Sequence, residues 1–244
     1  MTLGNDALDI LENESNPDDH VPASVGGLSG HLFRRIVHIA MMIIPFLYYW
    51  KGTNISEFFF DLEPKQFVSI VGFLFLLIEI TRLRMGFVVF GQRDYESKQV
   101  SAFFWGGFSV CLVLLISPEY GVQNSAFGFP LILSLTLIDP LMGELRRARF
   151  PSRNVILIGY FGALSIWLFS HYFLGTPLFI APFIAGLVVA SEWPRLTWID
   201  DNATMLLIPL SFIKRFDPAP IRLQEIFFLF IQLIKYLISS IFFG

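Results

Sequence analysis

The sequence predicts an all-α integral membrane protein, folded as a helical bundle with about seven to eight membrane segments. Of its 244 residues, 55% are hydrophobic and 15% are charged, whereas average usage is roughly 25% charged residues. The apolar residues form long runs separated by short polar stretches, and a bilayer core takes about 20 apolar residues per helix. Length and pattern together leave no room for a separate soluble domain.

The predicted segments follow one another closely, and turn-forming residues such as Pro118 and Pro151 separate them. Ahead of them, residues 1–30 are expected to form a disordered acidic tail, because residues 1–20 hold six acidic residues and neither Lys nor Arg. Residues 31–244 are expected to form a single transmembrane helical domain. The apolar runs cover residues 36–50, 67–80, 102–117, 126–142, 155–174, 177–190, 203–213 and 226–243.

The run at 203–213 is the shortest of these. As a helix, its 11 residues would measure roughly 17 Å, too short for a bilayer core of about 30 Å. We therefore expect a half-length or re-entrant segment, which would keep Lys214 and Arg215 on the side where most other basic residues lie. Such backbone is tolerated only inside protein or beside a cavity, so this segment is predicted to help build a site.

The basic residues predict the orientation of the chain in the membrane. Eleven Lys and Arg residues fall on the same side as the N-terminus, and two, Lys51 and Lys65, fall on the opposite side. Cytoplasmic loops carry the excess of Lys and Arg. A multi-pass protein with a cytoplasmic N-terminus and a cytoplasmic charged face is therefore predicted.

Polar residues gather near this boundary, and ionisable side chains at membrane depth often mark function. Arg34, Arg35 and His38 stand at the start of the first span. Arg34 and His38 are four apart and share a helix face, so this cluster is either a set of positive-inside anchors or a site for an anionic phosphate. Glu79 and Arg82 end the second span at a spacing of three, which allows a structural ion pair.

Two further clusters follow along the chain. Arg93 and Glu96 would by themselves form an ordinary solvated pair. Asp139 ends an apolar span, Pro140 is expected to end or kink that helix, and Gly143 permits close backbone approach. This is either a helix end with a basic loop, or a carboxylate for Mg²⁺ beside guanidinium groups for phosphates. The guanidinium groups belong to Arg146, Arg147, Arg149 and Arg153.

The last cluster precedes the short run. Glu192, Asp200, Asp201 and Asn202 place three carboxylates and an amide within eleven residues, and hard oxygen ligands suit Mg²⁺. Asp201 or Asn202 could equally cap the helix that follows. Phosphoryl transfer needs positioned phosphates, a metal and a group that orients the attacking hydroxyl, and the clusters supply all three kinds of group on one face of the membrane.

In their order, these pieces resemble the CTP-dependent polyprenol kinase family, which includes dolichol kinases and phytol kinases, and more loosely the phosphatidate cytidylyltransferases. The resemblance runs from about Arg34 to Pro209. It implies an all-helical membrane bundle that transfers a phosphoryl group from CTP, with Mg²⁺, to an isoprenoid alcohol. The matching pieces are Arg34-Arg35-x-x-His38, Glu79-x-x-Arg82, Arg93-x-x-Glu96, Asp139-Pro140 with Gly143, Glu192-Trp193, and Asp201-Asn202 with Pro209.

Clusters and resemblance together give each candidate residue an expected role. The expected catalytic residues are Asp139, Asp201 and Glu79, and the expected Mg²⁺ ligands are Asp139, Asp201 and Glu192. The nucleotide is expected to contact Arg82, Arg93, Arg146, Arg147, Arg153 and Asn202, with further polar lining from Arg35, His38 and Glu96. The expected partners are a nucleotide, an isoprenoid lipid alcohol and membrane lipids, and no nucleic-acid-binding pattern is visible.

Three other functions stay open at this point. A cytidylyltransferase would use the same nucleotide but release pyrophosphate. A divergent, non-catalytic family member would act as a lipid-binding scaffold; this is favoured by the missing Lys-Ser/Thr-x-Glu-Gly segment of the family, since no lysine occurs between Lys98 and Lys214. A transporter is the least favoured, because the charges lie at one boundary and no halves repeat.

Overall fold

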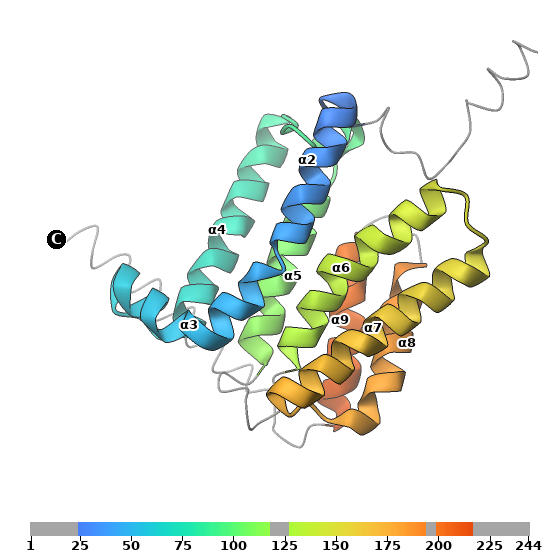
Figure 1. The fold of residues 1–244 in the computed structure, drawn as a ribbon. Helices are drawn as coiled ribbons and strands as arrows, with labels where there is room; N and C mark the ends of the chain where they lie inside the picture. Colours follow the sequence, from blue (N-terminus) through green and yellow to red (C-terminus); the bar gives the residue numbers. More distant parts are fainter. Residues whose placement is uncertain (1–23, 118–126, 194–198, 217–244) are drawn as a thin grey trace, which may run out of the picture.

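A computed structural model describes residues 24–117, 127–193 and 199–216, and these form an almost wholly helical fold (Figure 1). The predicted acidic stretch before residue 24 and the predicted last segment, 226–243, lie outside the described residues. The helices are α2 (Gly27–Ala40), α3 (Ile43–Phe60), α4 (Pro64–Met85), η1 (Asp94–Ser97), α5 (Ala102–Ile116), α6 (Gly128–Arg147), α7 (Ser152–Leu174), η2 (Leu178–Ile180), α8 (Ala181–Glu192) and α9 (Asp201–Phe216).

Four stretches of helix are long and apolar enough to cross a membrane, as expected of a helical membrane protein. Two shorter apolar helices, Ala102–Ile116 and Leu178–Glu192, accompany them. Within the described residues there are thus four long candidates, where the sequence predicted seven to eight membrane segments for the whole chain. The four are Gly27–Phe59, Pro64–Met85, Gly128–Arg147 and Ser152–Leu174.

The first candidate span is a nearly continuous path made of α2 and α3. It begins at Gly27, inside the range that the sequence assigned to the acidic tail. The two helices are separated by a short turn, in which the amide of Met41 still donates to the carbonyl of Val37 at 3.1 Å. α4 then starts with Pro64 in its first turn, where a missing N–H does no harm.

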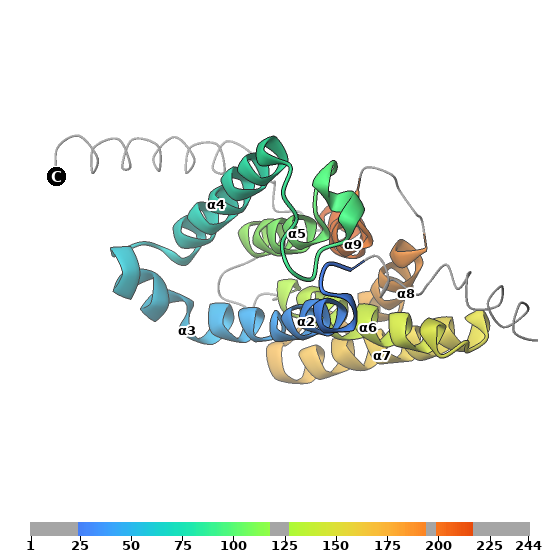
Figure 2. The same cartoon turned by 90° about the horizontal axis from the view of Figure 1, so that it is seen from above.

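Helix α6 forms the centre of the bundle, and it contacts α2, α3, α5, α7, α8 and α9 (Figure 2). In its apolar window 67% of the residues are buried, against 28% in the window of Pro64–Met85. Phe129, Leu131, Ile132 and Leu135 are fully buried along it. Helix α6 is therefore the core element, and its position fixes where its polar residues can lie.

The run at 203–213, predicted to be half-length or re-entrant, belongs to a longer helix that does not turn back, and this helix is not among the four that are long and apolar enough to cross a membrane. α9 is one continuous helix of 16 residues from Asp201 to Phe216, roughly 24 Å long. Its first turn lies beside the C-terminal half of α6. Near its other end, Lys214 Nζ lies 5.7 Å from the ring centre of Phe127, which precedes α6. Lys214 is therefore at the opposite end of the bundle from Arg146 and Arg147, which end α6.

The alternating helix directions bring polar termini together at one end of the bundle. α2 and α9 begin there, and α4, α6 and α8 end there (upper part of Figure 1). Helix α6 reaches this end because it continues through Pro140 to Arg147. Of the two expectations for Pro140, that it ends the helix is wrong, and that it kinks the helix stays a prediction; Asp139 lies within the helix instead of at its terminus.

Candidate functional site

A small polar cavity of about 70 Å³ lies at this charged end. It is enclosed by α2, the last turns of α6, the first residues of α9 and the loop that follows α4. Seven of the predicted site residues line it: Arg35, His38, Arg93, Asp139, Arg146, Asp201 and Asn202. Residues far apart in the sequence are therefore brought into one site, to which Ser24, His31, Arg34 and Gly143 also contribute.

Among the residues that line the cavity, arginines outnumber carboxylates. Its arginines are Arg34, Arg35, Arg93 and Arg146, and its carboxylates are Asp139 and Asp201. The planar guanidinium group matches the oxygens of a phosphate. Such a lining favours an anion held by arginine with a carboxylate nearby, which is the combination that the sequence analysis expected.

One face of α2 supplies part of this lining. His31, Arg35 and His38 are spaced by four and three residues, which places them on a single helix face. Arg35 Nε lies 3.5 Å from Glu144 Oε1, and His31 Nε2 lies 3.8 Å from the same oxygen. The Nε2 atom of His31 is buried and makes no hydrogen bond to any described residue. A polar ligand in the cavity could form the hydrogen bond that this nitrogen lacks.

His38 joins α2 to the central helix. Its Nε2 atom lies 3.1 Å from the carbonyl oxygen of Leu135 and 3.4 Å from Asp139 Oδ2. Pro140 has no N–H to offer the carbonyl four residues before it, which loosens the helix ladder in this turn. The carbonyl affected is that of Thr136, so His38 contacts the carbonyl next to it in the same turn and lies beside the carboxylate of Asp139.

The start of α9 is fixed by carboxylates. Asp200 Oδ1 accepts a hydrogen bond from the amide of Asn202 at 3.1 Å, and Asp201 Oδ1 accepts from the same amide at 3.0 Å. The residue before the helix, Asp200, therefore takes the capping role expected for Asp201 or Asn202. Burial, and next the charge of Asp201, raise the pKa of Asp200 well above its usual range. The side-chain oxygen of Asn202 is buried and has no hydrogen-bond partner among the described residues.

Glu192 lies behind the cavity and does not line it. One of its carboxylate oxygens is paired with Arg146, whose guanidinium carbon lies 5.7 Å from the ring centre of Trp193. The side chain of Glu192 is completely buried. The structure thus gives this carboxylate a role in positioning Arg146, where the sequence predicted a metal ligand.

Glu79 and Arg82 form the ion pair that their spacing allowed, and almost every polar atom of the pair is occupied. Arg82 donates from Nε and Nη2 to the two oxygens of Glu79, at 2.9 and 2.7 Å. Its remaining N–H groups reach the carbonyls of Phe87, Glu96 and Gln99 at 3.2, 2.6 and 2.7 Å. All five N–H groups of the guanidinium are thereby used.

The carboxylate of Glu79 is equally engaged on its other side. It accepts hydrogen bonds from the amide and the hydroxyl of Ser101, at 2.6 and 3.1 Å. Glu79 and Arg82 are 5% and 2% exposed. This geometry favours a structural role, in which the pair fastens the loop between α4 and α5, over the catalytic and nucleotide-binding roles predicted for them.

Glu96 also finds a different partner from the one its spacing suggested. Its Oε1 atom accepts from Arg34 Nη1 at 2.9 Å and from the backbone amide of Arg93 at 3.2 Å. The side chain of Arg93 instead contacts Tyr95 and lines the polar cavity. Glu96 is therefore the residue that orients Arg34, which no sequence spacing could indicate because the two are 62 positions apart.

Arg147 and Arg153 lie outside the polar cavity. Arg147 Nη1 lies 3.5 Å from Glu144 Oε2, one turn away on the outer side of α6. Arg153 is exposed in the first turn of α7. The structure does not bring these two predicted nucleotide contacts together with the seven residues that line the cavity.

A Mg²⁺ site fits this arrangement only in part. Among the described residues there is no group of three or more His, Cys, Asp or Glu side chains placed to hold a metal. Asp139 and Asp201 do line the same cavity. Mg²⁺ is usually held by one or two carboxylates together with substrate phosphates and water, so these two carboxylates fit a metal that arrives with a nucleotide and not a metal caged by protein alone.

A second, larger cavity of about 410 Å³ adjoins the polar one. The two share Arg34, His38 and Asn202, which we call the junction residues. Beyond them the larger cavity is mostly apolar, with Phe33 and Phe103 among its walls, and the predicted site residues Glu79, Arg82 and Glu96 also line it. The cationic site thus opens directly onto a surface suited to hydrocarbon.

Sequence reasoning missed His31, although its place on the face of Arg35 and His38 was a readable signal. No family model matches the chain, and no curated protein and no solved structure shows significant similarity to it.

Proposed function

We propose that the chain is a membrane-embedded lipid-alcohol kinase that transfers a phosphoryl group from a nucleotide, CTP by the resemblance of its motifs, to an isoprenoid alcohol. One observation carries the proposal. A cationic cavity that contains Asp139 and Asp201 meets an apolar cavity at the junction residues. A molecule that fills both must have a hydrocarbon body and a polar end that reacts with, or carries, phosphate.

The size of the polar cavity supports a phosphoryl group as its occupant. Its volume of about 70 Å³ is well below the roughly 300 Å³ and more of pockets that enclose whole small ligands. In this proposal the terminal phosphate of the nucleotide enters the cavity, and the base stays outside it. The positive-inside rule supports a cytoplasmic position for this end, on the side where nucleotides are found.

In the proposed reaction the lipid hydroxyl oxygen forms a bond to the terminal phosphorus, and the bond from that phosphorus to the oxygen of the departing CDP breaks. Asp139, which lies beside His38, orients the hydroxyl and takes up its proton. The arginines hold the phosphate oxygens. Asp139 and Asp201 would hold Mg²⁺, which when bound would offset the negative charge of the phosphates.

The test is phosphate transfer by the purified protein in lipid nanodiscs. CTP or ATP labelled at the γ-phosphate is offered with Mg²⁺ and with isoprenoid alcohols or diacylglycerol. We expect labelled isoprenoid phosphate with CTP, and a fall of more than about 100-fold in Asp139→Asn and Asp201→Asn, because such groups act only when correctly placed. Asp94→Asn is the matched control, because Asp94 is exposed and lies outside the cavity.

Two results would overturn the proposal. If folded wild-type protein transfers no phosphate from either nucleotide to any alcohol, the proposed kinase activity is refuted. Release of pyrophosphate with a cytidylyl group joined to phosphatidate would assign the site to a cytidylyltransferase instead.

A further inference from the structure

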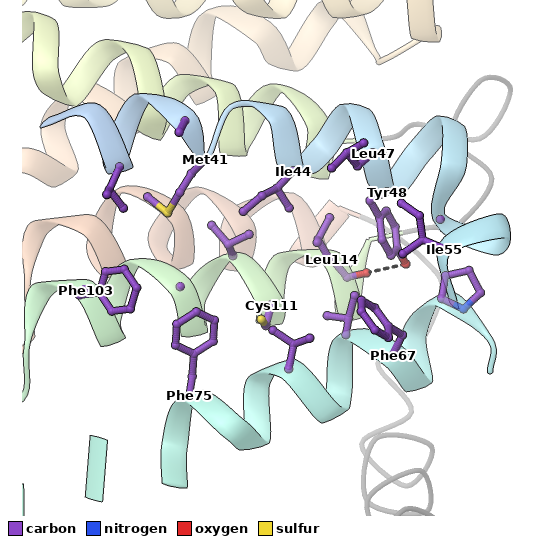
Figure 3. Close-up of a pocket in the computed structure, with 18 residues that line it drawn as sticks. Met41, Ile44, Leu47, Tyr48, Ile55, Phe67, Phe75, Phe103, Cys111 and Leu114 are labelled. Carbon is purple, nitrogen blue, oxygen red and sulfur yellow. Dashed lines mark hydrogen bonds between the residues drawn. The ribbon is translucent and has the colours of Figure 1, made fainter. Parts of the chain in front are cut away.

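A long apolar groove of about 490 Å³ lies between α2–α3 on one side and α4–α5 on the other (Figure 3). Ile44 and Leu47 come from α3, Phe67 and Phe75 from α4, and Leu114 from α5. Tyr48 also lines the groove, but its hydroxyl donates to the carbonyl of Leu114 at 3.3 Å. The walls therefore present hydrocarbon, which suits an apolar occupant.

The groove continues the path that begins in the polar cavity. Val37, Met41 and Phe103 line both the groove and the cavity that contains the junction residues. Along α2 and α3 the groove extends from Val37 to Ile55, which corresponds to roughly 25 Å of helix. This is close to the bilayer core of about 30 Å, so one chain could lie in the groove with its polar end at the junction.

The rim of the groove faces outwards. Phe103 is 54% exposed and Leu47 is 46% exposed, although both line the groove. Figure 2 shows α2 and α4 standing apart, with α5 between them and closer to the rest of the bundle. In a membrane these exposed apolar side chains would meet lipid, so a hydrocarbon chain can move into the groove sideways.

We propose that this groove binds the hydrocarbon chain of the lipid substrate, which enters from the bilayer between α2 and α4. The chain runs from the junction residues towards the turn between α3 and α4, where Gly52 and Pro64 line the far end. The identity of the head group rests on the proposed kinase function, whereas the chain site rests on the groove alone. The far end limits the length of chain that is accommodated.

Two positions allow the groove to be blocked at chosen depths. Val37 lines it next to the junction, so Val37→Trp places a large ring near the head-group end. Gly52 lies at the far end, where an added Cβ would be 3.6 Å from Pro64 Cβ, an ordinary contact; Gly52→Phe therefore fills that end without a backbone clash. Ile36→Trp is the matched control, because Ile36 is 65% exposed and does not line the groove.

The first experiment measures binding without turnover. The full chain in nanodiscs is irradiated with an isoprenoid alcohol that carries a diazirine at the far end of its chain, and the labelled peptides are identified by mass spectrometry. We expect labels on the far part of the groove, at Ile55, Pro64 and Phe67. An excess of unlabelled alcohol and the Val37→Trp change should each reduce this labelling at least tenfold, and Ile36→Trp should not reduce it.

The second experiment measures transfer as a function of chain length. Val37→Trp should reduce transfer to both medium and long alcohols at least tenfold. Gly52→Phe should reduce transfer only to the long ones. A five-carbon alcohol should react equally in the wild type, Gly52→Phe and Ile36→Trp, because its chain does not reach the far end of the groove, and this shows that Gly52→Phe is folded.

The outcomes separate this proposal from the kinase function. Labels scattered over outward-facing positions such as Ile36, without competition by unlabelled alcohol, would overturn the chain site even if transfer occurs. If unlabelled alcohol reduces labelling in the groove but the protein transfers no phosphate, the binding site for the hydrocarbon chain is supported and the kinase activity is refuted. Equal sensitivity of short and long alcohols to Gly52→Phe would overturn the far end as a limit on length.

Discussion

Replacement of Arg82 by Met should destabilise the fold, and it tests whether this arginine is structural. Met keeps much of the side-chain volume but removes all five hydrogen bonds and leaves Glu79 as a buried carboxylate without its main partner. Removing one member of a buried pair typically lowers the free energy of unfolding by about 3–5 kcal/mol. At about 1.4 kcal/mol per tenfold, the unfolded fraction should rise between roughly 140-fold and 3,700-fold.

The assay is equilibrium unfolding in mixed detergent micelles, followed by tryptophan fluorescence. Arg84→Met is the control, because Arg84 lies on the same helix but is exposed, and surface changes usually stay within about 0.5 kcal/mol. The double variant Glu79→Gln with Arg82→Met should lose less than the sum of the two single changes, because the pair acts as a unit. If Arg82→Met unfolds like the wild type and yet loses phosphate transfer, the structural role is refuted and Arg82 is a nucleotide ligand.

Three further predictions follow from the same site. Gly143→Ala would place a Cβ 2.6 Å from Arg35 Nη2 and displace that guanidinium, so the affinity for CTP should fall about tenfold, measured by equilibrium binding, with little change in stability. Arg146→Met should lower the free energy of unfolding by about 1–3 kcal/mol, because it leaves the buried carboxyl of Glu192 without its hydrogen-bond donor; adding Glu192→Gln should restore part of the loss. Burial raises the pKa of Asp200, so the folded state keeps a proton that the unfolded chain releases near about pH 4. The free energy of unfolding should therefore fall as the pH rises above that value. Unfolding measured from pH 4 to 8 should depend less on pH in Asp200→Asn than in the wild type, and an unchanged pH dependence would contradict the raised pKa of Asp200.

The clustering of the site at one end of the bundle could be predicted from the sequence. Long apolar runs with Lys and Arg at alternate boundaries leave few places for charges, and the spacing of Glu79 and Arg82 allowed the pair that is observed. The partner of Glu96 could not be predicted in this way. Arg34 reaches it through the tertiary fold, and residues 62 positions apart in sequence share no local pattern.

Helix boundaries were misjudged where polar groups belong to a helix. The apolar run at 203–213 omitted the polar first and last turns of α9, so the helix was taken to be shorter than its 16 residues. Pro140 was expected to interrupt α6, but a proline is tolerated in a membrane helix when neighbouring groups satisfy the freed backbone. His38, which belongs to α2, lies 3.1 Å from the carbonyl of Leu135, next to the carbonyl of Thr136 that Pro140 leaves without its helix donor. The presence of His38 there follows from packing and not from local sequence.

The hydrogen-bonded cluster around Glu79 and Arg82 also bears on the order in which the chain can fold during synthesis. Its bonds join α4 only to residues between Phe87 and Ser101, all within a short stretch of chain. Contacts between near neighbours in sequence can close early, without waiting for distant segments. An α4–α5 hairpin can therefore pair the buried charges of Glu79 and Arg82 before α6 has been synthesised.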